Sequence, residues 1–94
     1  KGGAVGFSRT LAREVGSDFI TVNTVTPGAI RTEAEIEMVP DAQDVALAPI
    51  MEVQAIKRRG TSDDVAAAIA FLCNDDASFI TGQNLVVDGG WMLN

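Results

Sequence analysis

The sequence predicts an α/β fold built on a parallel sheet. Two helical patterns each precede a strand pattern, so the order along the 94 residues is helix, strand, long loop, helix, strand. In the first strand pattern, residues 20–26, six of the seven residues are β-branched, and apolar and polar residues do not alternate. Such a strand suits a sheet covered on both faces, and helices are the usual crossovers between parallel strands.

Residues 3–15 are expected to form the first helix, since apolar side chains recur there at helical spacing. The expected buried stripe consists of Ala4, Phe7, Leu11, Ala12 and Val15. Arg9 and Arg13 fall on the opposite face. Gly16 is expected to end the helix by adopting the left-handed conformation.

The strand at residues 20–26 is expected to stop at Pro27 and Gly28, because proline cannot donate to a sheet ladder. Residues 33–59 carry only a weak pattern, with short helical turns as candidates at 34–39 and 50–57. A segment this long without a clear element is usually a functional lid or a disordered stretch.

A second helix is expected to begin at Thr61, whose hydroxyl can cap the helix while Asp63 and Asp64 favour its dipole. Its apolar stripe consists of Val65, Ala68, Ile69 and Leu72. Residues 74–76 should close this helix. Residues 83–87 then read as a short strand, which residues 88–90 end.

The composition argues against several classes of function. A net charge of -6 disfavours binding to nucleic acid or to an anionic membrane. No histidine is present, so we expect no metal site and no Ser–His or Cys–His pair. The longest apolar run, residues 65–73, is too short to span a bilayer.

The single cysteine, Cys73, cannot form an internal disulfide, which fits a reducing, cytoplasmic compartment. It lies in an apolar helical run, so we expect a small buried side chain rather than a nucleophile.

The best candidate for a ligand site is the turn at residues 27–32, because ligands of parallel sheets bind beyond the carboxyl ends of the strands. The backbone groups freed there can pair with a planar polar ligand, and Thr32 adds a hydroxyl. A plain connection between strand and loop is the alternative interpretation.

Five short motifs, in order, resemble the C-terminal part of the classical short-chain dehydrogenases/reductases. They are KGGAV at 1–5, ITVN and PGAIRT at 20–23 and 27–32, RGTSDDVA at 59–66, FLCNDDASFITGQ at 71–83 and VDGG at 87–90. The resemblance implies a Rossmann-like, doubly wound parallel sheet. Residues 1–94 would be the C-terminal segment of a single NAD(P)-binding domain, with its last helices, its last two strands and a substrate loop at about 33–57.

The resemblance also implies a cofactor, NAD or NADP, and a role for six residues. Lys1 would be catalytic and would bind the nicotinamide ribose. The turn would shape the nicotinamide pocket through Pro27, Gly28 and Ala29, hold the carboxamide on the backbone of Ile30, and contact the carboxamide or pyrophosphate through Thr32. In the family's Tyr-x-x-x-Lys motif the proton-transferring tyrosine stands four positions before the lysine. The resemblance therefore implies a tyrosine four positions before Lys1, and the 94 residues themselves contain none.

The expected function is therefore interconversion of a secondary alcohol and a ketone in the complete protein, with a small carbonyl or alcohol substrate. A C=C reductase, epimerase or dehydratase of the same family stays open, as does a non-catalytic association module. The resemblance further implies a homotetramer or homodimer. Because the family's tyrosine and phosphate loop are absent, the 94 residues alone should be inactive.

Overall fold

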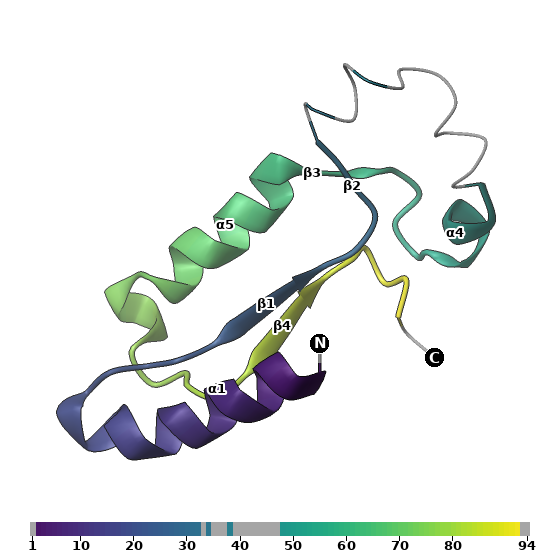
Figure 1. Ribbon diagram of the computed structural model, residues 1–94. Helices are drawn as coiled ribbons and strands as arrows, with labels where there is room; N and C mark the ends of the chain where they lie inside the picture. The colour runs from purple at the N-terminus through teal and green to yellow at the C-terminus, as the bar shows by residue number, and fades with distance from the viewer. Residues whose placement is uncertain (1, 33, 35–37, 39–47, 93–94) are drawn as a thin grey trace.

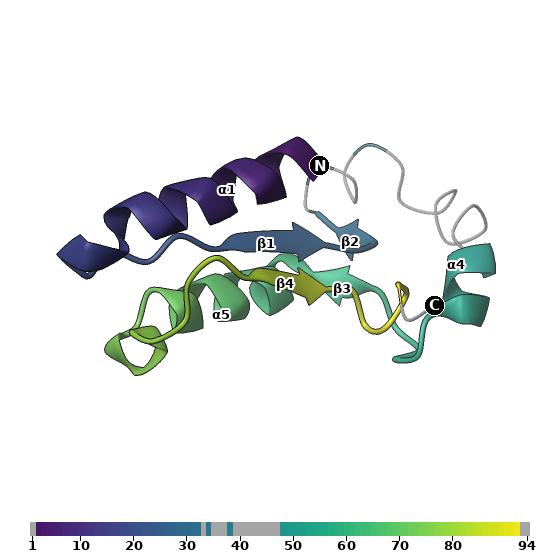
Figure 2. The ribbon, with the colours of Figure 1, turned by 90° about the horizontal axis from the view of Figure 1, so that it is seen from below.

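Two pairs of parallel strands form the centre of the molecule, and a helix covers each side (Figures 1 and 2). The computed structural model describes residues 2–32, 34, 38 and 48–92. The elements in order are α1 (Gly2–Val15), η1 (Gly16–Asp18), β1 (Thr24–Pro27), β2 (Ile30–Arg31), α4 (Ala48–Val53), β3 (Gly60–Thr61), α5 (Ser62–Leu72), η2 (Asp75–Ala77) and β4 (Asn84–Val87).

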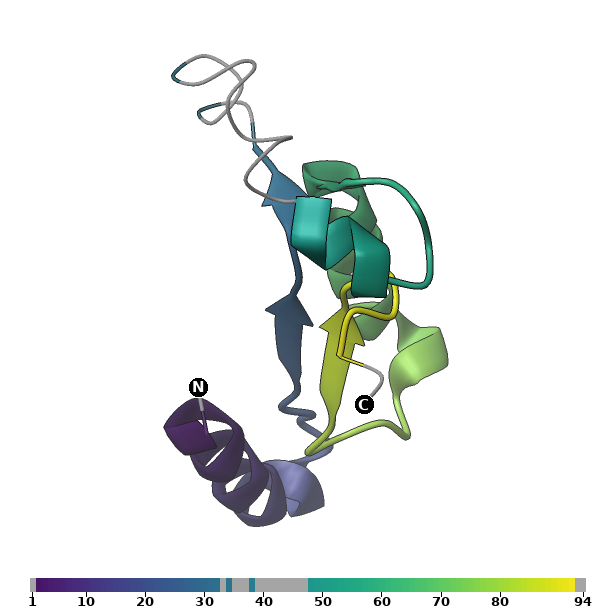
Figure 3. The ribbon, with the colours of Figure 1, turned by 90° about the vertical axis from the view of Figure 1, so that its right-hand side faces the viewer.

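The sheet is parallel throughout the described residues. β1 pairs with β4, with Thr24 opposite Asn84 and Pro27 opposite Val87, and β2 pairs with β3. Helices α1 and α5 lie on opposite faces of the β1–β4 pair (Figure 2), and α4 lies beyond the carboxyl ends of both strands (Figure 3). The doubly wound α/β class is thus confirmed, although the short β2–β3 pair was not expected.

Helix α1 packs on the sheet through a face that agrees with the expected stripe only in part. Ala12 is buried as expected, but Phe7 is 69% exposed. Ser8 is part of the contact face instead, because its hydroxyl accepts a hydrogen bond from the Thr24 hydroxyl of β1 at 3.1 Å. The polar serine and threonine therefore pair across the interface, while Leu11 and Val15 of the expected stripe are half-buried as predicted.

The end of α1 also differs from the prediction. Gly16 does not adopt the left-handed conformation but begins η1, and Phe19 is the residue with positive φ, at 61°. The Phe19 N–H donates to the Gly16 carbonyl at 3.0 Å, which closes this extra turn. The phenylalanine side chain is left 96% exposed.

The first regular strand begins four residues later than expected, because side-chain bonds replace part of the ladder. The Asn23 amide donates to the Ile80 carbonyl at 3.1 Å, and its oxygen accepts from the Gln83 N–H at 3.1 Å. Gly82, with φ of 69°, bends the facing segment, so regular pairing starts only at Thr24. Asn23 thereby aligns β1 with β4.

Helix α5 begins with the expected cap. The Thr61 hydroxyl accepts from the Asp64 N–H, and the Asp64 carboxylate accepts from the Thr61 N–H, which together form a capping box.

The prediction for Cys73 was wrong, since this cysteine is exposed just beyond the end of the helix. Of the expected stripe, Ile69 is 47% exposed.

The expected long loop is described only in part. The helical turn expected at 34–39 lies largely outside the described residues, and the turn expected at 50–57 occurs earlier, as α4. The Lys57 ammonium donates to the carbonyls of Met51 and Glu52 at 2.8 and 3.0 Å. This cation satisfies carbonyl groups at the C-terminal end of α4 and so fixes where the helix stops.

Large apolar side chains remain on the surface of the described residues. Phe79 is fully exposed, and Leu85 and Val86 of β4 are 39% and 43% exposed. Leu85 and Val86 are neighbours on one strand, so their side chains point to opposite faces and leave apolar surface on both sides of β4. None of the described helices combines the length and the apolar character needed to cross a bilayer.

Candidate functional site

The carboxyl ends of β1 and β4 approach each other closely at Gly28. The Gly28 N–H donates to the Val87 carbonyl at 3.0 Å. A Cβ placed on Gly28 would lie 2.5 Å from the Asp88 Cβ and 2.7 Å from its Cα. Any side chain here would push against backbone, so only glycine permits the two strand ends to meet.

The turn after Gly28 is held by a second contact, which comes from the β3 side of the sheet. The Arg59 Nε donates to the Ala29 carbonyl at 3.2 Å. The next residue, Ile30, enters β2 opposite Gly60, and its side chain covers the space where a Cβ on Gly60 would sit. The turn is thus fixed on both sides of Ala29.

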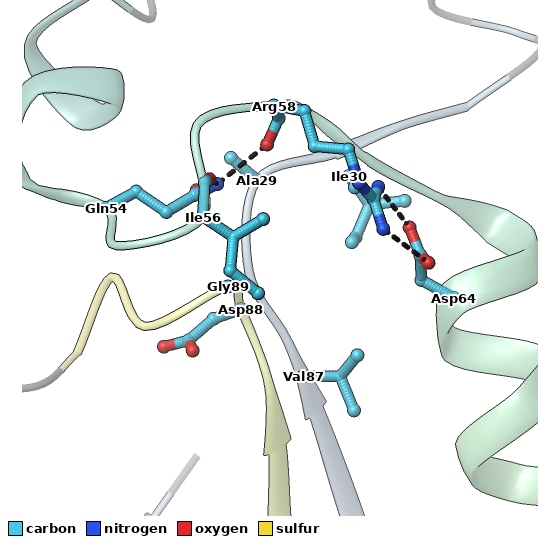
Figure 4. Close-up of a pocket in the computed structure, with 10 residues that line it drawn as sticks. Ala29, Ile30, Gln54, Ile56, Arg58, Asp64, Val87, Asp88 and Gly89 are labelled. Atoms are coloured by element: carbon cyan, nitrogen blue, oxygen red, sulfur yellow. Dashed lines mark hydrogen bonds and ion pairs between the residues drawn. The ribbon is translucent and has the colours of Figure 1, made fainter.

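A cavity of about 200 Å³ lies beside this turn (Figure 4). Its walls come from the strand ends and from the segment after α4. The strand ends contribute Ala29, Ile30, Val87, Asp88 and Gly89, and the segment contributes Gln54, Ile56 and Arg58, with Gly60 and Asp64 completing the lining. The cavity is therefore at the carboxyl edge of the sheet, where ligands of parallel α/β proteins bind.

The turn that closes β4 is organised by Asp88. Its carboxylate accepts hydrogen bonds from the N–H groups of Gly90 and Met92, both at 2.9 Å. Gly89 and Gly90 both have positive φ, at 63° and 87°, which suits their glycine identity. The carboxylate is occupied by its own turn, so we assign Asp88 a structural role.

Gln54 was not foreseen from the sequence as a site residue. Its side chain is 3% exposed and donates to the carbonyls of Ile56 and Arg58 at 2.6 and 2.7 Å (Figure 4). A single glutamine in a weakly patterned segment gives no periodic signal. Only the three-dimensional contacts identify it.

An ion pair joins the segment after α4 to helix α5. The Arg58 guanidinium donates to both carboxylate oxygens of Asp64, at 2.8 and 2.9 Å (Figure 4). The hydrogen bond from Arg58, with a further bond from the Thr61 N–H, holds the pKa of Asp64 well below its usual range. The pKa of Arg58 is raised by the same hydrogen bond. Asp64 therefore both caps α5 and anchors this cavity wall.

This pair predicts a pH dependence of stability. A lowered folded-state pKa means that the stabilisation by Asp64 is fully present above about pH 4, the ordinary aspartate value, and is lost as pH falls through the folded value. We expect Asp64→Asn to lower the urea midpoint of the complete protein near neutral pH. The difference from wild type should shrink as the pH falls toward about 2.

Asp63→Asn is the matched control, because Asp63 occupies the same first turn but does not pair with Arg58. Its midpoint should differ little from that of the wild type at any pH. A constant difference for Asp64→Asn from neutral to acid pH would contradict the assigned role of the carboxylate.

The structure brings together four of the six predicted site residues. Pro27, Gly28, Ala29 and Ile30 follow one another through the turn, with Pro27 exposed and the others half-buried. Thr32 is exposed and comes directly after β2. Lys1 lies outside the described residues. Among the residues that are described, no cluster of three or more acidic or cysteine side chains could hold a metal ion.

The parallel strands, the helices on both faces and the glycine turn at the carboxyl edge define a Rossmann-like α/β protein. A family model described as "Enoyl-(Acyl carrier protein) reductase" matches residues 1–92. The chain belongs to the short-chain dehydrogenase/reductase family.

Relatives and solved structures agree with this family. The chain is 46% identical over 94 residues to 3-oxoacyl-[acyl-carrier-protein] reductase FabG of Haemophilus influenzae, covering all of the chain and 37% of that relative. Among solved structures, a 4-hydroxyisoleucine dehydrogenase complexed with NADH superposes with a TM-score of 0.85 at 35% identity, over 98% of this chain and 37% of that one. YwfH, an NADPH dependent reductase involved in bacilysin biosynthesis, superposes with a TM-score of 0.82 at 32% identity, over 99% and 38%.

The chain thus spans less than two fifths of the length of the proteins it matches.

Proposed function

We propose that this chain is part of an oxidoreductase that interconverts a secondary alcohol and a ketone with NAD(H) or NADP(H). The observation that carries the proposal is the turn at Gly28, which is fixed at the carboxyl edge of a parallel sheet by backbone contact with Asp88. Similar proteins are named as a 3-oxoacyl reductase and as reductases or dehydrogenases that use NADH or NADPH.

The residues of the turn fit a nicotinamide. One edge of β2 pairs with β3, and no other described strand pairs with its second edge. A carboxamide, which is planar and carries both donor and acceptor groups, can pair with backbone groups of Ile30 there. Pro27, Gly28 and Ala29 would shape the ring pocket, and the Thr32 hydroxyl would reach the carboxamide or the pyrophosphate. The cofactor supplies or accepts the hydride.

Lys1 is proposed as the catalytic residue of this chain. Its ammonium would bind the ribose hydroxyls and lower the pKa of a tyrosine four positions earlier in the complete enzyme. That phenol would then exchange a proton with the substrate oxygen, as general acid in one direction and base in the other. The role is carried over from the family's motif, which residues 1–5 match.

A C=C reductase is the second candidate, and the description of the matching family model favours it. The same turn and lysine would serve both reactions. The two differ in the substrate: a 3-oxoacyl thioester offers a ketone, and an enoyl thioester offers a double bond.

The experiment is an assay of the complete protein with NADH and with NADPH, using a 3-oxoacyl thioester and an enoyl thioester in parallel. We expect nicotinamide oxidation with the ketone only. Turnover of the enoyl substrate alone would replace the proposal by the second candidate. No turnover, together with no binding of either nicotinamide, would contradict the proposed function.

A homodimer or homotetramer is part of the proposal, as is a cytoplasmic location. Two features of β4 support self-association: it has a strand partner on one edge only among the described residues, and its Leu85 and Val86 side chains are exposed. Light scattering of the complete protein should give a mass of two or four chains, and a monomer would contradict it.

A further inference from the structure

We propose that Gln54 is a positioning residue that fixes the segment after α4 as one wall of the site, and that it thereby sets the affinity for the substrate. The proposal rests on the proposed function. The side chain of Gln54 is buried beside the cavity (Figure 4). It takes no part in the functions proposed above for Lys1 and the turn.

The burial of Gln54 is matched by its hydrogen bonds. Glutamine is seldom found fully buried, because its amide must be satisfied away from water. Here the Nε2 group donates to the carbonyls of Ile56 at 2.6 Å and Arg58 at 2.7 Å, which uses both of its hydrogens. One side chain thus binds two carbonyl groups of a segment that lacks regular secondary structure.

The backbone of Gln54 ties this arrangement to helix α4. Its N–H donates to the Ile50 carbonyl at 2.8 Å, just past the end of the helix. The segment from α4 to Arg58 is therefore held by one residue from both its backbone and its side chain. Arg58 in turn pairs with Asp64 of α5, so the wall is anchored at its far end.

Gln54 also contacts the turn that follows β4. A Cβ on Gly89 would lie 2.9 Å from the Gln54 Nε2 and 3.1 Å from its Cδ. The Ile56 N–H donates to the Gly89 carbonyl at 2.8 Å. The glutamine and the glycine are thus packed so closely that the wall is seated on the carboxyl edge of the sheet, next to the Gly28 turn.

The nicotinamide turn has separate supports, which gives the proposal its specific consequence. Gly28 is bonded to Val87, and Ala29 to Arg59, and neither bond involves Gln54. Loss of the Gln54 bonds should therefore loosen the wall and leave the turn in place. We expect the KM for the ketone to rise while kcat and the Kd for the nicotinamide stay close to their wild-type values.

The first test is Gln54→Met in the complete enzyme. Methionine keeps the length and volume of the side chain and removes both donors. We expect the KM of the ketone to rise about tenfold, which corresponds to about 1.4 kcal/mol. Gln83→Met is the matched control, because Gln83 is exposed and its amide donates only to the nearby Thr81 carbonyl at 3.2 Å. Its KM should stay within about twofold of the wild type.

A second variant, Gln54→Glu, separates positioning from simple loss of packing. An ionised carboxylate would face two carbonyl oxygens, whereas a protonated one can donate to one of them. We expect the KM of this variant to be about tenfold above the wild-type KM at pH 8 and only about twofold above it at pH 6. A KM ratio that stays near tenfold at both pH values would overturn the proposal. So would an equal fall of kcat and nicotinamide affinity in both variants.

Amide hydrogen exchange distinguishes failure of this inference from failure of the proposed function. In Gln54→Met the amides of Gln54, Ile56 and Arg58 should exchange faster, while those of α5 keep their wild-type rates. A wild-type protein that neither turns over the substrates nor binds either nicotinamide would overturn the proposed function and with it the effect on KM. Unchanged exchange at these three amides would overturn the role of Gln54 whatever the activity.

Discussion

Replacing Lys1 by alanine in the complete enzyme is expected to lower kcat/KM by about a thousandfold and to weaken nicotinamide binding. A cation about 4 Å from a phenolate contributes roughly 4 kcal/mol at an effective dielectric of about 20. That energy corresponds to about three pKa units, which is enough to bring a tyrosine from about 10 toward neutrality. Without Lys1 the tyrosine should remain protonated at the working pH.

The measurement is the pH profile of kcat/KM for wild type, Lys1→Ala and Lys1→Arg. The apparent pKa of the basic group should rise by about three units in the alanine variant and by much less in the arginine variant, which keeps the charge. An unchanged profile in Lys1→Ala would remove this residue from the site.

The second large effect is expected for Gly28→Ala. The added methyl group would lie 2.5 and 2.7 Å from the Asp88 Cβ and Cα, so the backbone of one strand end must move. We expect a loss of about 1–3 kcal/mol in the free energy of unfolding, in the range known for overpacked sites. Nicotinamide affinity should fall at least about tenfold, because the turn that we propose to hold the ring is displaced.

Gly16→Ala is the control for this change, since a Cβ at Gly16 would meet no atom within 4 Å apart from its own local backbone and chain neighbours, and its φ is not positive. Urea unfolding and nicotinamide titration of both variants make the comparison. If Gly28→Ala were as stable as Gly16→Ala and bound nicotinamide as tightly, the close approach of the strand ends would not be needed for stability or for cofactor binding.

Elements with strong local signals were predictable from the sequence. Helix α5 carries a capping box, and its start at Ser62 follows from the Thr61 cap alone. The strand ending at Val87 was expected one residue longer than it is, which is the usual precision for an element end. In these places the local preference and the tertiary structure agree.

The features that were missed depend on distant contacts. The two-residue strands β2 and β3 are too short for any periodicity, and they exist because Ile30 and Gly60 meet across the sheet. The contact face of α1 includes Ser8 only because Thr24 offers it a partner. Burial of Cys73 was expected from the apolar run before it, but the helix ends at Leu72 and leaves the cysteine exposed.

The candidate site was likewise predictable where the sequence signal is local, and unpredictable where distant contacts decide. Pro27 and Gly28 predict a turn at a strand end, and their position in a parallel sheet predicts a ligand edge. The reason that residue 28 must be glycine is Asp88, which lies 60 positions later in the sequence. Gln54 is held by carbonyl groups of its own segment and by contact with Gly89. None of these contacts can be predicted from the sequence pattern.

A crystal structure of the complete enzyme with bound nicotinamide cofactor is the most direct test of the account. The account predicts that the Lys1 ammonium lies within hydrogen-bond distance of the ribose hydroxyls, and that the backbone of Ile30 pairs with the carboxamide of the same cofactor. Finding the amine and the Gly28 turn on opposite sides of the sheet would contradict it.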